Sequence, residues 1–284
     1  MHLADRILGL THHLIGNQRT AREFTERALR QPHLLSPTSG IGYQVETPVA
    51  MRAQLARILW LMGFPDRAMQ AVRDAVGIAL NGRRSFPVCY AIGFAGLPIA
   101  LWVGAADEAR RQIDLLGAQA NGNERWEQWR LCFARALRLK AGDEAEALTA
   151  AFIEATGDPV SVPPFADRAI DAPIPVPLPG AEPVDTQWNT PEVLRVDAEL
   201  LLWHGAPGAV AAAETKLLRA LEIARGQSAL SWELRAATSL ARMRRDRGDV
   251  ADAAAILHPV YSRFTEGFNT TDLKTAKTLL DDLH

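Results

Sequence analysis

Histidine is the residue type in this chain that could most readily hold a metal ion, and the sequence contains seven. His12 and His13 are adjacent, so on a helix their side chains point about 100° apart and cannot chelate one ion together. The other histidines have no His, Cys or carboxylate partner at a spacing that forms a recognised metal site. We therefore predict that the chain binds no metal.

Nucleophilic catalysis is not indicated by the sequence either. There is no GxSxG motif of the kind that exposes a catalytic serine. Cys89 lies in an apolar run and Cys132 in the segment WEQWRLCFARAL, so both are expected to be small core residues. Glu144 and Glu146 follow Gly142, where acidic residues suit the start of a helix. We predict no catalytic residue and no cofactor, and a protein that is not an enzyme.

The charge balance and the N-terminal sequence bear on partners and location. The 31 basic and 33 acidic residues give a net charge of −2, which provides no global attraction to nucleic acid or to anionic membranes. Asp5 and Arg6 interrupt any signal-peptide core, and two cysteines suit a reducing, cytoplasmic setting. Residues 85–106 lack charge and reach membrane-spanning length, but the repeat described next passes through them and favours a buried helix.

The elements that must position any binding residue recur along the chain. Six glycines end helical runs rich in Leu, Trp or Arg, and an alanine follows five of them at a distance of five residues. Glycine ends a helix well because it adopts the left-handed conformation freely, and a small residue lets the next helix approach closely. The glycines are Gly16, Gly63, Gly104, Gly142, Gly205 and Gly248, and the matching positions are Ala21, Ala68, Ala109, Ala147, Val210 and Ala253.

The first unit, from Ile7 to Pro32, resembles the tetratricopeptide (TPR) consensus nearly position by position. Successive turn glycines are 47, 41, 38, 63 and 43 residues apart, whereas the family period is 34 residues. The resemblance implies an all-α fold, a right-handed superhelical solenoid of TPR-like helix hairpins with a C-terminal capping helix at Thr270–Leu283. The residues that carry it are Leu8, Gly9, Gly16, Ala21, Ala28 and Pro32.

The longest glycine spacing marks an insertion that holds nine of the 17 prolines. Proline at this density opposes helix and favours extended backbone. We predict one continuous solenoid in three parts: four hairpins in residues 1–156, a Pro-rich connecting segment in residues 157–191, and two hairpins plus the capping helix in residues 192–284. The connecting segment is expected to dock through its apolar residues Phe165, Ile170, Ile174, Leu178 and Trp188.

The last third, Glu214 to Leu283, resembles the C-terminal TPR-like region of bacterial regulators that carry a winged-helix or cyclase domain and a signal-transduction ATPase. The segments SWELRAATSLARM, HPVYSRFTEGF and DLKTAKTLLDDL carry this resemblance, and RILWLMGFPDRA is similar to the same region. No GxxxxGK[ST] loop is present, so ATPase activity is not implied. The chain is expected to be either part of such a regulator or a free-standing relative.

In TPR arrays the first helix of each pair lines a concave groove, so the resemblance implies a partner-binding surface. Aromatic and arginine residues at these positions are favoured at interface hot spots. The alternative is that Trp60, Trp102 and Trp203 are core residues and that the RMRRDRGD run from Arg242 is a solvated helix end. The groove positions are Arg6, His13, Arg57, Trp60, Phe94, Trp102, Trp129, Lys140, Arg195, Glu199, Trp203, Arg235, Arg242 and Arg245.

These observations favour a non-catalytic protein–protein interaction or ligand-sensing module of a bacterial signalling or transcription-regulatory system. The expected partner is a protein or peptide, including the ATPase or effector domain of a longer regulator, and a small ligand is a second option. The charge balance argues against nucleic acid and against a membrane. The alternatives are a free-standing TPR scaffold and an enzyme with its active site in the groove.

Overall fold

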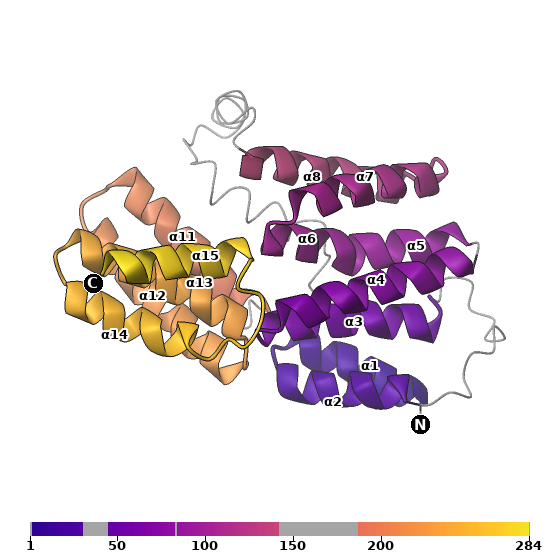
Figure 1. Cartoon of the computed structure of the whole chain (residues 1–284), viewed down its shortest axis with the longest axis horizontal. Helices are drawn as coiled ribbons and strands as arrows, with labels where there is room; N and C mark the ends of the chain where they lie inside the picture. The colour runs from indigo at the N-terminus through magenta and orange to yellow at the C-terminus, as the bar shows by residue number, and fades with distance from the viewer. Residues whose placement is uncertain (1, 31–44, 83, 142–186, 284) are drawn as a thin grey trace. The chain divides into compact units, whose positions relative to one another are not determined.

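The computed structural model describes residues 2–30, 45–82, 84–141 and 187–283, and every regular element in these ranges is a helix (Figure 1). The predicted all-α class is confirmed for this part of the chain. The chain divides into two compact units. Unit 1 comprises Met1–Arg130, Thr186–Trp188 and Gln227–Ala229, and unit 2 comprises Leu131–Asp185, Asn189–Gly226 and Leu230–His284.

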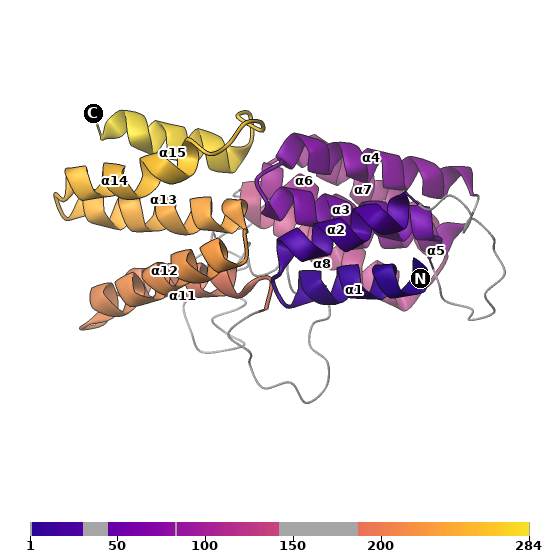
Figure 2. The same cartoon turned by 90° about the horizontal axis from the view of Figure 1, so that it is seen from below.

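Unit 1 is built from helices that pack in pairs, and each pair packs on the next (Figures 1 and 2). Helix α1 packs on α2, α3 on α4, and the segment α5–η2–α6 on α7, while α8 begins in this unit. The bounds are α1 His2–Leu14, α2 Gln18–Leu29, α3 Thr47–Leu61, α4 Pro65–Asn81, α5 Ser85–Ala91, η2 Ile92–Gly96, α6 Leu97–Val103, α7 Ala106–Ala120 and α8 Glu124–Ala141.

Short-range sequence signals set the ends of these helices. Pro48 and Pro65 lie in the first turns of α3 and α4, where the missing N–H costs nothing and the fixed φ suits a helix. The turn glycines Gly16, Gly63, Gly104 and Gly248 have φ between 78° and 88°, as predicted for left-handed helix ends. The alanines five residues later, Ala21, Ala68, Ala109 and Ala253, are fully buried.

The fifth turn departs from the predicted register. Val210, the position five residues after Gly205, is 47% exposed, so it is not a contact residue between paired helices. Gly205 and Gly208 both have positive φ, and α12 starts only at Ala209. The turn is therefore three residues longer than in the other pairs, and the buried small residue is Ala213, five residues after Gly208. Gly142 and Ala147 lie outside the described residues.

The uncharged segment of unit 1 forms one interrupted helix, α5–η2–α6. Ser85–Val103 is long and apolar enough to cross a membrane. However, 78% of its 18-residue apolar stretch is buried inside the protein. A π-helical turn, η2, precedes Pro98, which has no N–H to donate to the carbonyl of Phe94 four residues earlier. The guanidinium of Arg57 donates a hydrogen bond to this carbonyl at 3.0 Å. Arg57 of α3 thus donates to the backbone carbonyl of Phe94, to which Pro98 has no N–H to donate.

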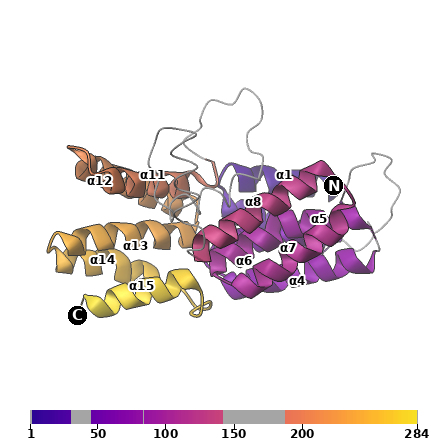
Figure 3. The same ribbon diagram turned by 90° about the horizontal axis from the view of Figure 1, so that it is seen from above.

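Unit 2 contains two further helix pairs and a last helix. Helix α11 (Thr190–His204) packs on α12 (Ala209–Gly226), and α13 (Leu230–Asp246) packs on α14 (Val250–Tyr261). Helix α13 also contacts both α11 and α15 (Thr271–Asp282), so it lies between them, as Figures 2 and 3 show. This central position explains why α13 is buried along most of its length.

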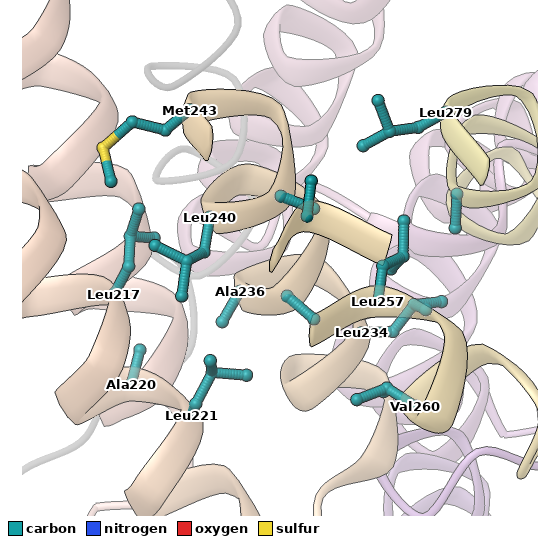
Figure 4. Packing of buried hydrophobic residues seen from close by; sticks show 14 of the residues in the cluster. Leu217, Ala220, Leu221, Leu234, Ala236, Leu240, Met243, Leu257, Val260 and Leu279 are labelled. Atoms are coloured by element: carbon teal, nitrogen blue, oxygen red, sulfur yellow. The ribbon is translucent and has the colours of Figure 1, made fainter. Parts of the chain in front are cut away.

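The core of unit 2 consists mainly of leucines and alanines from all of these helices, together with Met243, Val260 and Phe264. Figure 4 shows Leu217 and Leu221 of α12 facing Leu240 of α13, and Leu257 of α14 near Leu234 of α13. Each fully buried leucine contributes about 2 kcal/mol relative to exposure to water. The inner stripe predicted for the last helix is confirmed, because all of its members are buried: Leu273, Ala276, Leu279, Leu280 and Leu283.

Most of the predicted Pro-rich connecting segment lies outside the described residues. This applies to Phe165, Ile170, Ile174 and Leu178, so their docking remains a prediction. Thr190 and Pro191, which the prediction placed in the connection, form the first turn of α11, a position that tolerates proline. Trp188 is described, and it is buried within unit 1.

Candidate functional site

Five residues of the predicted groove line one hollow of about 120 Å³ in unit 2, which we call the polar hollow. They are Lys140, Arg195, Glu199, Arg235 and Arg242. The other lining residues are Thr238, Ser239, Asp272 and Thr275. The polar hollow is thus formed almost entirely by charged and hydroxyl side chains.

Four helices line the polar hollow: α8 supplies Lys140, and helical spacing explains how the other three present their groups. On α13, Arg235 and Arg242 are seven residues apart with Thr238 and Ser239 between them, a spacing that places all four on one face. Helix α11 supplies Arg195 and Glu199 from successive turns, and α15 supplies Asp272 and Thr275 in the same way. Because α13 packs between α11 and α15, its polar face meets theirs.

A buried ion network lies behind the polar hollow and is centred on Glu192. The carboxylate of Glu192 accepts two hydrogen bonds from Arg195, at 2.8 and 3.0 Å, and one from Arg235 at 2.7 Å. All three residues are buried. Paired, charge-assisted hydrogen bonds of this kind offset the large cost of removing charges from water. The network therefore fixes both guanidinium groups in place.

Two further carboxylates complete the network toward the opening. Arg195 Nη1 donates to Glu199 Oε1 at 2.6 Å, and the hydroxyl of Ser239 donates to the same oxygen at 2.7 Å. Arg235 Nε donates to Asp272 Oδ2 at 2.8 Å. These bonds join α11, α13 and α15 through polar contacts in addition to the apolar core.

Arg242 differs from the other two arginines of the polar hollow. Its side chain is exposed, and within the described ranges no carboxylate lies within 4.0 Å of its nitrogens. An arginine presents five N–H donors in a planar fork that matches carboxylate or phosphate oxygens. Arg242 can therefore donate hydrogen bonds to a group that enters the polar hollow.

Two other predicted binding residues of unit 2 do not line the polar hollow. Trp203 lies near the end of α11 and is 47% exposed, so the alternative of a core role does not hold for this tryptophan. Arg245 forms ion pairs with Asp246 at 2.8 Å and with Asp282 at 3.8 Å. Both residues remain accessible on the surface of unit 2.

In unit 1, the predicted groove residues His13, Arg57, Trp60 and Trp102 are buried. Trp60 and Trp102 stack on each other with ring centroids 4.4 Å apart, which agrees with the alternative of core packing. The Arg57 guanidinium carbon lies 4.4 Å from the ring centroid of Trp188 and 5.2 Å from that of Trp102. These arrangements favour packing and cation–π contacts over direct contact with a partner.

The hydrogen bonds around His13 define its protonation state. Arg57 Nε donates to His13 Nε2 at 3.3 Å, so this ring nitrogen is the acceptor and the proton is on Nδ1. Nδ1 lies 2.9 Å from Gln18 Oε1, which accepts its hydrogen bond. Burial, together with the positive charge of Arg57, lowers the pKa of His13 to about 3, and the bond to Gln18 opposes this only in part. His13 is therefore neutral at physiological pH.

The remaining predicted residues of unit 1 are partly accessible. Arg6 is half-buried and donates a hydrogen bond to Thr47 Oγ1 at 3.4 Å, and burial lowers its pKa below the usual range. Trp129 is half-buried and contacts the ring of Trp126 edge-on at 5.4 Å. Phe94 is buried in the cluster around Arg57, with its ring centroid 5.0 Å from the guanidinium carbon.

The expectation for the two cysteines is half right. Cys89 is buried, and burial raises the pKa of its thiol to about 11. Cys132, however, is exposed rather than part of the core. The buried side of α8 runs through Trp126, Phe133 and Leu137, and residue 132 falls off this stripe because of the helical period.

Sequence reasoning missed several residues of these sites. Glu192 could have been found, because it stands three residues before Arg195 on the same helix face. Asp272 and Thr275 gave no such signal, since their partners are distant in the sequence. In the parts of the chain that the structure describes, no group of three or more His, Cys, Asp and Glu side chains could hold a metal ion.

Comparison of the sequence with protein-family models gives no match, and a search of curated proteins also gives none. The chain is therefore described by its fold and by the polar hollow, without a family. In the described ranges, the structure consists of paired helices with a hollow lined by four cationic and two anionic side chains.

Proposed function

We propose that the chain is a non-catalytic docking module that binds a protein or peptide partner in a bacterial signalling or transcription-regulatory system. In this proposal the helix pairs form a TPR-like, right-handed superhelical solenoid closed by α15. The single observation that supports docking most strongly is the convergence of Arg195, Glu199, Arg235 and Arg242 on the polar hollow.

The position of the polar hollow supports a docking role. Its walls come from α11 and α13, the first helices of two successive pairs, from α15, which follows them, and from α8, which supplies Lys140. First helices are the ones that the TPR resemblance expects to contact a partner. In this proposal the polar hollow lies on the concave side of a TPR-like array.

The rigidity of its walls also supports binding. Arg195 and Arg235 are held by Glu192, so their donors are already oriented before a partner arrives. A site that is ordered in advance loses less conformational entropy on binding. Arg242, in contrast, is exposed and available to a new acceptor.

The regulatory role depends on the resemblance of Glu214–Leu283 to the end of bacterial signal-transduction ATPases. This segment includes α13 and α15, two of the helices that line the polar hollow. The natural partner is then the ATPase or effector domain of a longer regulator. A free-standing scaffold is the second candidate, and it would use the same surface. If the chain regulates an ATPase, adding it to that ATPase domain changes the rate of ATP hydrolysis.

The docking proposal is tested by selecting peptides against the full chain. A library of ten-residue peptides displayed on phage is selected on the immobilised protein, and the affinities of the selected peptides are measured by calorimetry. Arg242→Ala is expected to weaken binding by about tenfold or more, because truncating a charged hot-spot residue is costly. Arg219→Ala, at an exposed arginine of α12 that does not line the polar hollow, is the matched control and keeps full affinity.

Two results would contradict docking at the polar hollow. Selection that yields no peptide above background from several independent libraries speaks against a peptide-binding module. Peptides whose affinity is the same for the Arg242→Ala variant, the control and the wild-type chain place the binding surface elsewhere.

A further inference from the structure

Helix α1 is amphipathic in the reverse of the usual sense, with polar groups inside and apolar groups outside. Asp5, Gly9 and His13 are four residues apart and form its buried face, on the side where α1 packs against α2 and α3. A surface helix normally turns its charged and polar side chains to water. In the described stretch from residue 3 to residue 15, however, no exposed residue is charged. The exposed residues are Leu3, Ala4, Ile7, Leu8, Thr11 and Ile15.

Specific contacts on the buried side fix this orientation of α1. The carboxylate of Asp5 pairs with Arg27 of α2, and His13 is held by the hydrogen bonds described above. A Cβ atom at Gly9 would lie 2.7 Å from Gln54 Nε2 of α3, so only glycine allows so close an approach there. The helix cannot turn its leucines inward without breaking these contacts. Its apolar side therefore faces away from the core of unit 1.

The outward side of α1 exposes long aliphatic side chains. The exposed fractions are 57% for Leu3, 55% for Ile7, 52% for Ile15 and 38% for Leu8. A contiguous apolar patch on a protein surface marks an interaction site, because covering it removes apolar surface from water. Since this patch carries no charge, the surface that complements it best is also apolar and uncharged.

The spacing of the patch makes it complementary to itself. Its residues form two rows along the helix, and in each row the successive spacings are four, three and four residues, the alternation typical of paired helices. Such a row reads the same in both directions, so a second copy of α1 that runs antiparallel meets it in register. Leu3 then lies at the end of the second copy that carries Leu14 and Ile15. The two rows, which we call the α1 face, are Leu3, Ile7, Leu10 and Leu14, and Ala4, Leu8, Thr11 and Ile15.

We propose that two copies of the chain associate through their α1 faces, with the two helices antiparallel about a twofold axis. A twofold interface uses the same patch on both copies, as the symmetric spacing of the α1 face allows. The interface belongs to unit 1 and does not use the polar hollow of unit 2, so this inference is independent of the docking proposal.

The size of the α1 face sets the strength of the association. Helix α1 has 13 residues and is therefore about 20 Å long. One face of such a helix covers less than the roughly 800 Å² per partner of a standard stable interface. The dimer is therefore reversible, with an expected Kd on the order of 10 μM.

The test is sedimentation velocity of the full chain at concentrations from about 1 to about 200 μM, a range that brackets this Kd. The wild-type chain is expected to change from monomer to dimer. Ile7→Glu is expected to weaken self-association more than about tenfold, because each copy would bury an unpaired charge. Leu218→Glu, at a leucine of α12 that is 50% exposed, is the matched control and should dimerise like the wild-type chain. Far-UV circular dichroism shows whether each variant is folded, and Leu3→Glu replaces Ile7→Glu if that variant is not.

A pair of variants tests the antiparallel register. Leu3→Glu and Ile15→Lys lie at opposite ends of the α1 face, and each is expected to weaken self-association on its own. Mixed in equal amounts, the two variants should associate with each other at least about tenfold more tightly than either does with itself, because the new carboxylate and ammonium groups meet across the interface. In a parallel pair the two groups would lie at opposite ends, and mixing would give no gain.

Several outcomes would overturn the inference. A wild-type chain that stays monomeric over the whole range has no such interface. A dimer that Ile7→Glu and Leu3→Glu leave unchanged uses another surface, and a mixture without gain refutes the antiparallel arrangement. A monomer that binds phosphatidylcholine vesicles and loses this binding in Ile7→Glu would assign the α1 face to a membrane surface instead.

Discussion

The neutral state of His13 makes the stability of unit 1 depend on pH. His13 is fully buried, and its Nε2 accepts a hydrogen bond from Arg57. A proton on Nε2 would place two cationic N–H groups against each other without solvent. The folded chain therefore resists protonation of His13, whereas the unfolded chain protonates it at the ordinary pKa of 6.5. Protonation of His13 thus favours unfolding.

The size and direction of the effect follow from linkage. The pKa of His13 is about 3 when folded and 6.5 as the ordinary value, so between these values the unfolded state binds the extra proton. The stabilisation is fully present above pH 6.5 and is lost as the pH falls toward 3. Each pH unit in this window costs about 1.4 kcal/mol. Lowering the pH from 7 to 5 should therefore lower the free energy of unfolding by about 2 kcal/mol through His13 alone.

The measurement is urea unfolding of the wild-type chain and of His13→Gln at pH 7 and pH 5, followed by tryptophan fluorescence. Trp188 stacks on His13, so fluorescence reports on this part of unit 1. Other groups titrate in both proteins, and their contribution cancels in the difference between them. The wild-type chain should lose about 2 kcal/mol more than the variant over this interval. An equal loss in the two proteins would refute the assignment of His13 as a buried neutral histidine.

Three further changes test packing, the ion network and a turn. Ala68→Leu should overpack the buried contact of α4 and lower the free energy of unfolding by about 1–3 kcal/mol in thermal or urea unfolding. Glu192→Ala should cost about 3–5 kcal/mol in urea unfolding, because it leaves Arg195 and Arg235 buried with fewer partners. Gly16→Ala should cost at least about 1–2 kcal/mol by the same assay, since φ at Gly16 is +83°.

Each of these changes has a control or a result that would contradict it. Val210→Leu, at an exposed position of α12, is the control for Ala68→Leu and should leave stability unchanged within about 0.5 kcal/mol. A Glu192→Ala variant as stable as the wild-type chain would show that Glu192 does not stabilise the buried Arg195 and Arg235. A Gly16→Ala variant as stable as the wild-type chain would show that this turn does not require the left-handed conformation.

The helix pairs could be predicted because their signals are local. A glycine and an alanine five residues apart mark the turn and the close contact, and both effects act within two helical turns. The same reasoning failed at Val210, where two glycines lie in one turn and the sequence does not show which of them sets the register. It failed at Cys132 because the helical period, not the local apolar composition, decides which side is buried.

The sequence by itself determined the all-α class, the positions of most turns and the burial of the last helix's inner stripe. Tertiary structure alone decided which arginines remain accessible. Arg57 and Arg242 are alike as residues in a predicted groove, yet Arg57 is buried against His13, 44 residues away, and Arg242 is exposed in the polar hollow. Glu192 and Arg235 meet across 43 residues. Contacts of this range depend on how helices pack, because the period of a single helix does not specify its neighbour.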